Sequence, residues 1–311
     1  MLELCDYIDR TYPELFYFVP EYYITAVSAI VKAFLRMDPQ GLDFLWTKCS
    51  PAMVPREALL DRFITFVTNH ISDKRIPNPD QQESFLIKLG ILLQYRDVVS
   101  RLETHPVAKT KLVPAFLRDF GKSNVNALAK NFLRLFKKNL YNDLAYTVLP
   151  DYGSEYFRKQ FVELCTADIK LREAFLNTFL DHLNNTLTEL KLHYSECSNI
   201  SLTTRERDQH KRDSRVSYSI LYDMLRVLET TVSLIPFVFL EADGLFRQRA
   251  ADLCMLVIRE GIQGQLGRFL SDLASEDCIL NRRNFGRQKV RDAVHAAESY
   301  CGGVPGATQL V

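Results

Sequence analysis

"LREAFLNTFLDHLNNTLTELKLHY", residues 171–194, carries the strongest secondary-structure signal in the sequence. Its large apolar side chains recur at intervals of three and four residues, which places them on one face of an α-helix. They are Leu171, Phe175, Leu176, Phe179, Leu183, Leu187 and Leu190. Acidic residues, among them Glu173, Asp181 and Glu189, occupy positions between them. The pattern predicts an amphipathic helix that buries one face against other helices.

The same periodicity recurs along most of the chain. Helical spacing of apolar residues is found from Tyr23 to Phe34, from Leu59 to Val67, from Phe85 to Leu93, from 217 to 235 and from 247 to 260. Alternation of apolar and polar residues between tight turns, the pattern of strands, is not sustained anywhere. The sequence therefore predicts an all-α fold: an elongated stack of antiparallel helices forming an armadillo or HEAT-like superhelical scaffold.

Prolines and glycines mark the expected helix boundaries. In "RIPNPDQQESFLIKLGILLQY", residues 75–95, Asn78 is placed to cap a helix, and Pro79 is placed at its first position, where a missing N–H costs nothing. Further breaks are expected at Pro39, Pro51, Pro55, Pro77, Pro106, Pro150, Gly153, Gly244 and Gly261. The chain is thus expected to consist of helices joined by short connections.

The organisation predicted from these boundaries is one elongated domain. It covers residues 1–300 and contains a polar stretch near 195–216, "SECSNISLTTRERDQHKRDSRV", interpreted as a loop that ends in an exposed helical stem. Residues 301–311, "CGGVPGATQLV", have the composition of a flexible tail or linker. A repeat of fixed period is not visible, although irregular helical arrays often show none in one sequence.

Composition narrows the function classes. The 39 basic residues balance 38 acidic ones, so the net charge of +1 gives no overall field to attract nucleic acid or an anionic membrane. No stretch reaches the ~18 uncharged apolar residues of a membrane helix, and the acidic N-terminus is unlike a secretory signal. Seven scattered cysteines without a C-x-x-C pair fit reduced thiols. We expect an intracellular protein of the cytoplasm or nucleus.

Histidines could supply a catalytic base. The six are His70, His105, His182, His193, His210 and His295, and none lies in a recognisable nucleophile motif. His182 falls on the polar face of the 171–194 helix, and His105 precedes Pro106 in a turn. Surface or capping roles are therefore preferred over catalysis.

Two cysteines could carry a thioester. Cys165 lies near Glu163 and Asp168, and Cys254 lies near Asp252, but both cysteines fall on apolar stripes. A buried cysteine behaves as a small hydrophobic residue whose thiolate is disfavoured. A structural role is preferred for both.

Phosphate and nucleic-acid binding are considered next. The glycines of "REGIQGQLGRF", which are Gly261, Gly264 and Gly267, follow a helix and lack the lysine and hydroxyl side chain of a phosphate loop. Two basic patches are interleaved with aromatic residues: Lys130, Arg134, Lys137 and Lys138, and then Arg282, Arg283, Arg287, Lys289 and Arg291. Solvated helix faces are preferred over a nucleic-acid groove, and the second patch is the better placed to meet an acidic protein. No catalytic, cofactor-binding or metal-binding residue is assigned, and no cofactor is expected.

Four phrases resemble a known family. They are "YFVPEYYITAVSAIVKAFLRMDP" (17–39), "DRFITFVTNHISDKRIPNPDQQESFLIKLGILLQY" (61–95), "THPVAKTKLVPAFLRDFG" (104–121) and "FVELCTADIKLREAFLNTFLDHLNNTLTELKLHY" (161–194). In this order they are similar to the core of E4-type ubiquitin chain-elongation factors, the U-box ligases. The second and fourth also resemble the RING-bearing catalytic subunit of the Kip ubiquitylation-promoting complex. The matching positions Pro77, Asn78, Pro79, His105, Pro106 and Pro114 are fold markers and not a site.

The resemblance implies the scaffold core of a non-covalent ubiquitin-protein ligase, which is an acyltransferase. Such a core holds a substrate protein, a shuttle factor or an AAA segregase, while a RING or U-box elsewhere binds the conjugating enzyme. No zinc-binding C-x-x-C spacing or U-box-like segment follows residue 265, so this segment is expected to have no activity alone. Either the chain is part of a longer ligase, or it is a scaffold that has lost the activity.

Two alternatives stay open. One is a helical-repeat adaptor in trafficking or transport with no role in ubiquitin transfer. The other is a covalent cysteine ligase or hydrolase, for which replacing one cysteine would abolish turnover. Neither nucleic acid nor membrane is expected as a partner.

Overall fold

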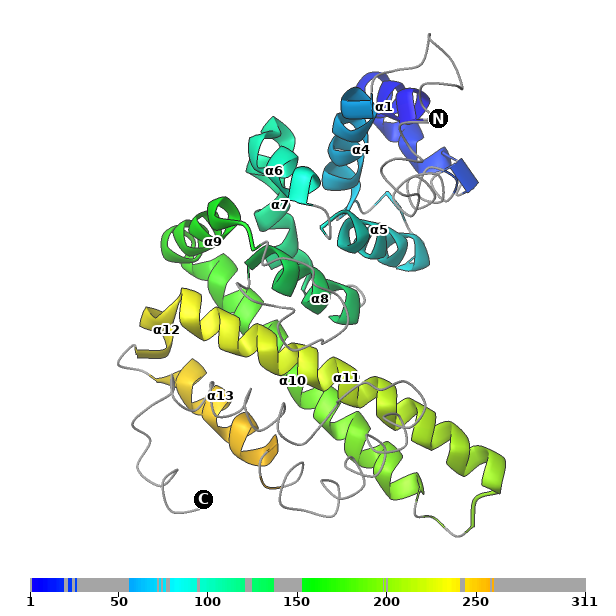
Figure 1. Ribbon diagram of the computed structural model, residues 1–311, viewed down its shortest axis with the longest axis vertical. Helices are drawn as coiled ribbons and strands as arrows, with labels where there is room; N and C mark the ends of the chain where they lie inside the picture. Colours follow the sequence, from blue (N-terminus) through cyan, green and yellow to red (C-terminus); the bar gives the residue numbers. More distant parts are fainter. Residues whose placement is uncertain are drawn as a thin grey trace. The chain divides into compact units, whose positions relative to one another are not determined.

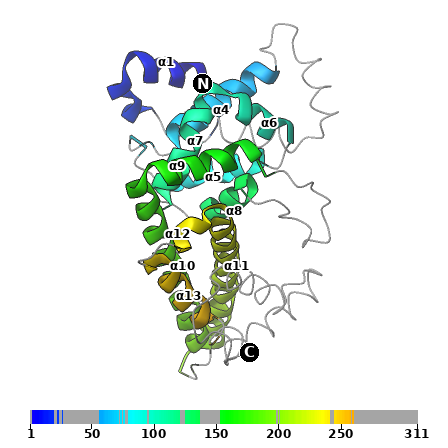
Figure 2. The same cartoon turned by 90° about the vertical axis from the view of Figure 1, so that its left-hand side faces the viewer.

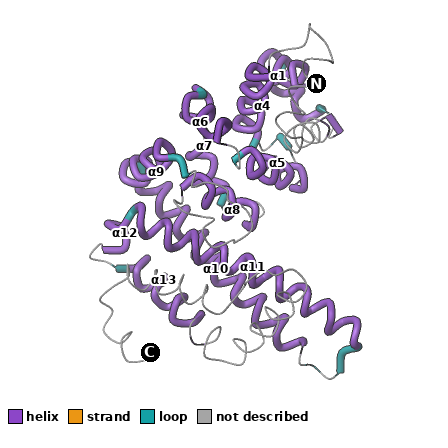
Figure 3. The backbone as a smooth tube through the Cα atoms, in the orientation of Figure 1, coloured by secondary structure: helices purple, strands orange, loops and turns teal. Residues whose placement is uncertain are grey.

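The computed structural model describes residues 2–19, 22–23, 26, 56–71, 73, 75–76, 79–93, 96–120, 125–136, 153–197, 199, 201–240, 244–257 and 259. Every regular element in these ranges is a helix, as Figure 3 shows in purple. The predicted all-α class is confirmed for this part of the chain, while the elongated superhelical stack stays a prediction. None of the described helices has the length and apolar character needed to cross a membrane.

The chain divides into two compact units within the stretch that the sequence analysis treated as one domain. Unit 1 consists of Met1–Tyr141 and Leu149–Leu164, and unit 2 consists of Asn142–Val148 and Cys165–Val311. Only residues 23 and 26 of the helix predicted from 23 to 34 are described. Several other predicted features lie outside the described residues: the tail from residue 301 and the breaks at Pro39, Pro51, Pro55, Pro77, Pro150 and Gly261.

Unit 1 is a set of short helices. They are α1 (Leu2–Thr11), the 3-10 helix η1 (Pro13–Phe18), α4 (Arg56–His70), α5 (Pro79–Leu92), α6 (Arg96–Thr104), α7 (Pro106–Asp119), α8 (Val125–Phe136) and α9 (Glu155–Ala167), whose residues to Leu164 belong to the unit (Figure 1). The main helix pairs are α4 with α7 and α5 with α8. Helix α1 packs against η1 and α4, and α6 packs against α7. Pro79 is the first residue of α5, as predicted.

Phenylalanines form the core of unit 1 where α7, α8 and α9 meet. The Phe132 ring lies 4.6 Å from that of Phe136, 5.5 Å from Phe161 and 6.1 Å from Phe120, centroid to centroid. The contacts with Phe161 and Phe120 are edge-to-face, an arrangement that aromatic quadrupoles favour. All four side chains are buried to 99% or more, so this cluster is a dry centre to which three helices contribute.

Helices α5 and α8 approach closely at a glycine. The Asn131 side-chain amide of α8 donates to the carbonyl of Leu86 at 2.6 Å, and the Arg134 guanidinium donates to the carbonyl of Gly90 at 2.6 Å. A Cβ atom at Gly90 would lie 2.5 Å from both Asn131 Oδ1 and Arg134 Nη1. Because Asn131 is buried and already hydrogen-bonded, it has little freedom to move away. Gly90 therefore permits the two polar bridges between the helices.

Replacing Gly90 by valine is expected to lower the free energy of unfolding of unit 1 by about 1 to 3 kcal/mol, because the side chain overpacks the contact with α8. Urea unfolding of the full chain, followed by hydrogen exchange in α5 and α8, measures the change. The matched control is Ile87→Val on the exposed side of α5, where Ile87 is 44% exposed and the effect should be small. An unchanged midpoint in Gly90→Val would contradict the close approach.

Helix α7 begins as the sequence indicates and then continues through a proline. The His105 ring accepts a hydrogen bond from the N–H of Ala108, and Pro106 follows at the first helical position. Pro114, one of the positions that match the ligase cores, lies inside α7. It cannot donate to the carbonyl of Thr110, but Val113, Phe116 and Leu117 around it are buried and hold the helix together.

Unit 2 is built on two long helices. Helix α10 (Ile169–Cys197) contains the predicted 171–194 helix, and α11 (Thr204–Leu234) returns antiparallel to it. Both views show the pair side by side, and it is the most extensive helix contact among the described residues (Figures 1 and 2). The predicted 217–235 helix is thus the second half of a longer one.

The start of α11 corrects the interpretation of residues 195–216 as mainly loop. Cys197 still belongs to α10, and the helix resumes at Thr204, so only residues 198–203 connect the two. Thr203 and Glu206 form a reciprocal capping box, with the Glu206 carboxylate accepting from the Thr203 N–H at 2.8 Å. The first turns of α11 are polar because they are exposed, and this hid the helical period.

Two shorter helices complete the described part of unit 2. Helix α12 (Pro236–Leu240) packs against α11 and α13, and α13 (Leu245–Leu256) also packs against α10. Gly244 precedes α13 with φ of +56°, a left-handed conformation that glycine adopts at little cost. The predicted break at Gly244 is confirmed, as is a helix near 247–260, which begins two residues earlier than predicted, at Leu245.

Candidate functional site

The α10–α11 pair consists of the two longest helices among the described residues. Its inner face is the predicted stripe: six of the seven residues, from Phe175 to Leu190, are at least 99% buried, whereas Leu171 is half-buried. The outer face of α10 exposes polar side chains, including Asn184, Asn185, Thr188 and Glu189. The pair therefore has a buried apolar inner face and a polar outer face that is exposed to solvent.

Helix α13 is fixed to α10 by a surface arginine. The guanidinium of Arg249 donates to Asn177 Oδ1 at 2.5 Å and to Asp181 Oδ1 at 2.8 Å. At the N-terminal end of α10, the guanidinium of the buried Arg172 lies 5.7 Å from the centroid of the Phe237 ring in α12. These contacts hold three helices of unit 2 in register.

A histidine pair lies near the connection between α10 and α11. His193 of α10 and His210 of α11 place their Nδ1 atoms 3.3 Å apart, and Asp213 lies one turn further along α11. Both histidines are candidates from the sequence, but their pairing was not predicted. The spacing from His210 to Asp213 was a visible signal, whereas His193 joins them only through the antiparallel return of the chain.

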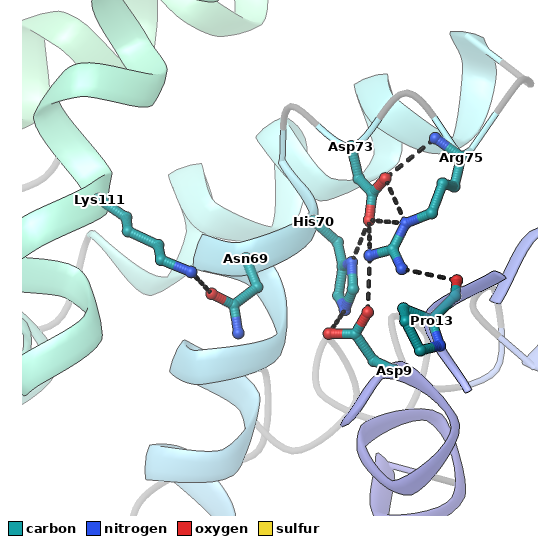
Figure 4. Close-up of polar contacts among 7 residues, drawn as sticks. All are labelled: Asp9, Pro13, Asn69, His70, Asp73, Arg75 and Lys111. Carbon is teal, nitrogen blue, oxygen red and sulfur yellow. Dashed lines mark hydrogen bonds and ion pairs between the residues drawn. The ribbon is translucent and has the colours of Figure 1, made fainter. Parts of the chain in front are cut away.

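A second polar cluster lies in unit 1, where η1 and α1 meet the end of α4 (Figure 4). His70 is 98% buried, with Nδ1 2.7 Å from Asp73 Oδ2 and Nε2 3.8 Å from Asp9 Oδ2. Its ring stacks on Phe16 at 4.3 Å between centroids. Arg75 binds Asp73 and Asp9, each at 2.6 Å, and donates to the carbonyl of Pro13 at 2.9 Å.

Ion pairs and hydrogen bonds in this cluster hold α1 against the end of α4. Burial alone would raise the pKa of Asp73, but hydrogen bonds from His70 and Arg75 outweigh burial and hold that pKa well below its usual range. The pKa of Arg75 is raised, chiefly by its bond to Asp73. Each nitrogen of the His70 ring faces a carboxylate, so the ring is not aimed at a nucleophile. The cluster joins α1 to α4 and has no arrangement suited to general-base catalysis.

Polar contacts also join α4 to α6 and α7. The Nζ of Lys111 donates to Asn69 Oδ1 at 2.7 Å (Figure 4), and Arg101 Nε donates to Asp61 Oδ1 at 2.6 Å. The Arg101 hydrogen bond lowers the pKa of Asp61. Burial lowers the pKa of His105, against a smaller opposing effect of Asp61, and this favours the neutral ring, which can accept the capping hydrogen bond. The predicted capping role of His105 is confirmed.

The two candidate thioester cysteines lie in apolar surroundings. Both Cys165 and Cys254 are at least 98% buried. Burial raises the pKa of Cys165 to about 12, with Arg172 opposing this only in part. Its acidic neighbours point elsewhere: Glu163 is exposed, and Asp168 accepts from the N–H of Leu171 at the start of α10. A thiol of this kind is a poor nucleophile at neutral pH.

The structure describes only some of the remaining candidate residues from the sequence analysis. His182 is half-buried on α10, and Asp252 accepts a hydrogen bond from Gln248 at 2.8 Å. In the first basic patch Lys130 is exposed, but Arg134 reaches across to α5, so these two do not form a common exposed surface. Lys137, Lys138, the patch from Arg282 to Arg291 and the three glycines Gly261, Gly264 and Gly267 lie outside the described residues.

Comparison with known proteins finds similarity in the sequence to a repeat family and to a ubiquitin ligase. A family described as RNF123-like, TPR repeat matches residues 173–280, which begin in α10 and include α11, α12 and α13. E3 ubiquitin-protein ligase RKP of Arabidopsis thaliana is 24% identical over 244 residues, covering 78% of this chain and 18% of the relative. No solved structure matches. The matches support a chain related to ubiquitin ligases, and neither supports the U-box chain-elongation factors specifically.

Proposed function

We propose that this chain is the helical scaffold of a ubiquitin-protein ligase, holding a substrate or partner protein while a RING or U-box outside residues 1–311 engages the conjugating enzyme. The observation that carries the proposal is the coincidence of the family match, residues 173–280, with the α10–α13 assembly. The ligase of Arabidopsis, similar over most of this chain, supports it. Since the chain spans about a fifth of that relative (18%), ligase activity of the whole protein is part of the proposal.

The physical contribution of such a scaffold is proximity. Ubiquitin transfer joins a substrate lysine to a thioester carried by the conjugating enzyme, so holding the two together raises their effective concentration without a catalytic residue in the scaffold. The buried phenylalanine cluster of unit 1 and the long pair of unit 2 provide stiffness. The proposed partners are a substrate protein, shuttle factors or an AAA segregase, in the cytoplasm or nucleus, with neither nucleic acid nor membrane bound.

The proposal is tested by reconstitution. The protein from its complete native reading frame is incubated with activating enzyme, conjugating enzymes, ubiquitin and proteins cross-linked to it in cell extract. Replacing Leu228, which is fully buried in α11, by alanine is expected to reduce conjugation of the captured proteins several-fold. Discharge of ubiquitin from the conjugating enzyme to free lysine should continue, because that step does not need the scaffold.

The matched control is Ser233→Ala on an exposed position of the same helix, which should leave both reactions unchanged. Failure of the complete protein to form conjugates with any conjugating enzyme would contradict the ligase proposal. Capture of coat or transport proteins whose ubiquitylation is independent of the chain would favour the trafficking adaptor.

A further inference from the structure

Three side chains with metal-binding atoms converge near the connection between α10 and α11. His193, His210 and Asp213 each offer a ligand atom, and these atoms lie within 4.8 Å of one another. All three are half-buried, so an ion could enter and the ligands would still be partly shielded from water. The ligands come from two helices, which gives a bound ion the means to join them.

The histidine separation matches zinc geometry. In a tetrahedral site with Zn–N bonds of about 2.0–2.1 Å, two ligand nitrogens lie about 3.3 Å apart. The Nδ1 atoms of His193 and His210 are 3.3 Å apart, and their rings are tilted by 40° rather than stacked. Asp213 lies one helical turn beyond His210, and rotation of its side chain can bring a carboxylate oxygen to the position of a third ligand. Two imidazoles and one carboxylate are ligands that zinc accepts.

Neighbouring side chains of α11 orient the Asp213 carboxylate. The amide of Gln209 donates to Asp213 Oδ1 at 2.9 Å, which leaves Oδ2 for an ion. Arg212 in turn donates to Gln209 Oε1, through Nη2 at 2.7 Å and Nε at 3.2 Å. Hydrogen-bonded partners of this kind orient ligating carboxylates in metal sites. Glu206, one turn before His210 on α11, accepts hydrogen bonds from the N–H and the hydroxyl of Thr203 in the capping box.

We propose that His193, His210 and Asp213 form a binding site for a divalent transition-metal ion of the zinc type, with the fourth coordination position left to water or another small ligand. Binding would fasten the ends of α10 and α11 to each other across the 198–203 connection. The inference stands on these residues alone and does not depend on the proposed ligase function.

Zinc titration of the full chain, freed of metal by a chelator, tests the site by calorimetry. The wild type is expected to bind zinc and to gain thermal stability on doing so. His193→Gln and His210→Gln should each weaken the affinity at least about tenfold, as should Asp213→Asn, because loss of a ligand costs no less than loss of a supporting partner. His182→Gln, a half-buried histidine of α10 outside the cluster, is the matched control and should bind like wild type.

Cobalt substitution distinguishes metal binding at this site from metal binding at the cysteines. Bound cobalt should show the visible bands of tetrahedral coordination without a thiolate charge-transfer band. Helicity measured by circular dichroism establishes that each variant is folded, and Asp213→Asn gives a test with the histidines in place. Three results would each overturn the proposal: no zinc binding by the wild type, unchanged affinity in the histidine variants, or a thiolate band at the titrated site. His193 and His210 would then be joined only by a hydrogen bond between their imidazoles.

Discussion

Replacing Phe132 by alanine is expected to lower the free energy of unfolding of unit 1 by about 3 to 5 kcal/mol. The side chain is 99% buried and meets the rings of Phe120, Phe136 and Phe161, which come from three helices. Truncation removes the transfer free energy of the ring and leaves a cavity that none of the three helices can fill without moving. The loss is a large fraction of the stability of an ordinary domain.

Urea unfolding of the full chain, followed by hydrogen exchange of separate peptides, measures this effect. Protection should fall in α7, α8 and α9, while the peptides of α10 and α11 report how much of the change stays in unit 1. Lys130→Ala, at an exposed position of α8, is the matched control and should change stability by less than about 0.5 kcal/mol. A loss below about 1 kcal/mol in Phe132→Ala would mean that the phenylalanine cluster is not closely packed.

Features that repeat every three or four residues could be predicted from the sequence. The stripe from Phe175 to Leu190 is buried as expected, because one amphipathic face fixes both the helix and its inner side. The start of α5 at Pro79 and the capping role of His105 follow from local chemistry that needs no tertiary information. The all-α class could thus be predicted from local signals alone.

Features that depend on exposure or on distant segments could not be predicted in the same way. The first turns of α11 show charged residues almost without an apolar stripe, although the T-x-x-E sequence at Thr203 was a usable helix-start signal. Pro114 stays inside α7 because buried neighbours outweigh one lost hydrogen bond. The division into two units depends on contacts between helices, which no local pattern contains.

The polar clusters were missed for a related reason. His70 and Asp73 are close in sequence, but Asp9 reaches them from α1 and Phe16 from η1. His193 and His210 are brought together by the short connection between α10 and α11, where the sequence predicted a longer loop. Both clusters join elements that are separate in the sequence, so their partners are decided by how helices pack and not by the residues next to them.

Replacing Asp73 by asparagine is expected to lower the free energy of unfolding of unit 1 by about 2 to 3 kcal/mol at pH 7. Asparagine retains an oxygen for the N–H of Arg75, which Asp73 Oδ1 accepts at 2.9 Å, so the change chiefly removes the negative charge beside the buried His70. The loss should be smaller than for a fully buried pair, because Arg75 is 33% exposed and keeps Asp9 as a partner.

The effect of Asp73→Asn should also depend on pH in a defined direction. Because the pKa of Asp73 is lowered in the folded protein, its stabilisation is present above the ordinary aspartate pKa of about 3.9 and is lost as pH falls through the folded value. The difference in the free energy of unfolding between wild type and variant should therefore become smaller below about pH 4. Hydrogen exchange in α1 and α4 at a series of pH values measures it, with Glu155→Gln, an exposed carboxylate of unit 1, as control. A difference that is negligible at pH 7, or that grows in acid, would show that Asp73 does not hold α1 to α4 through its charge.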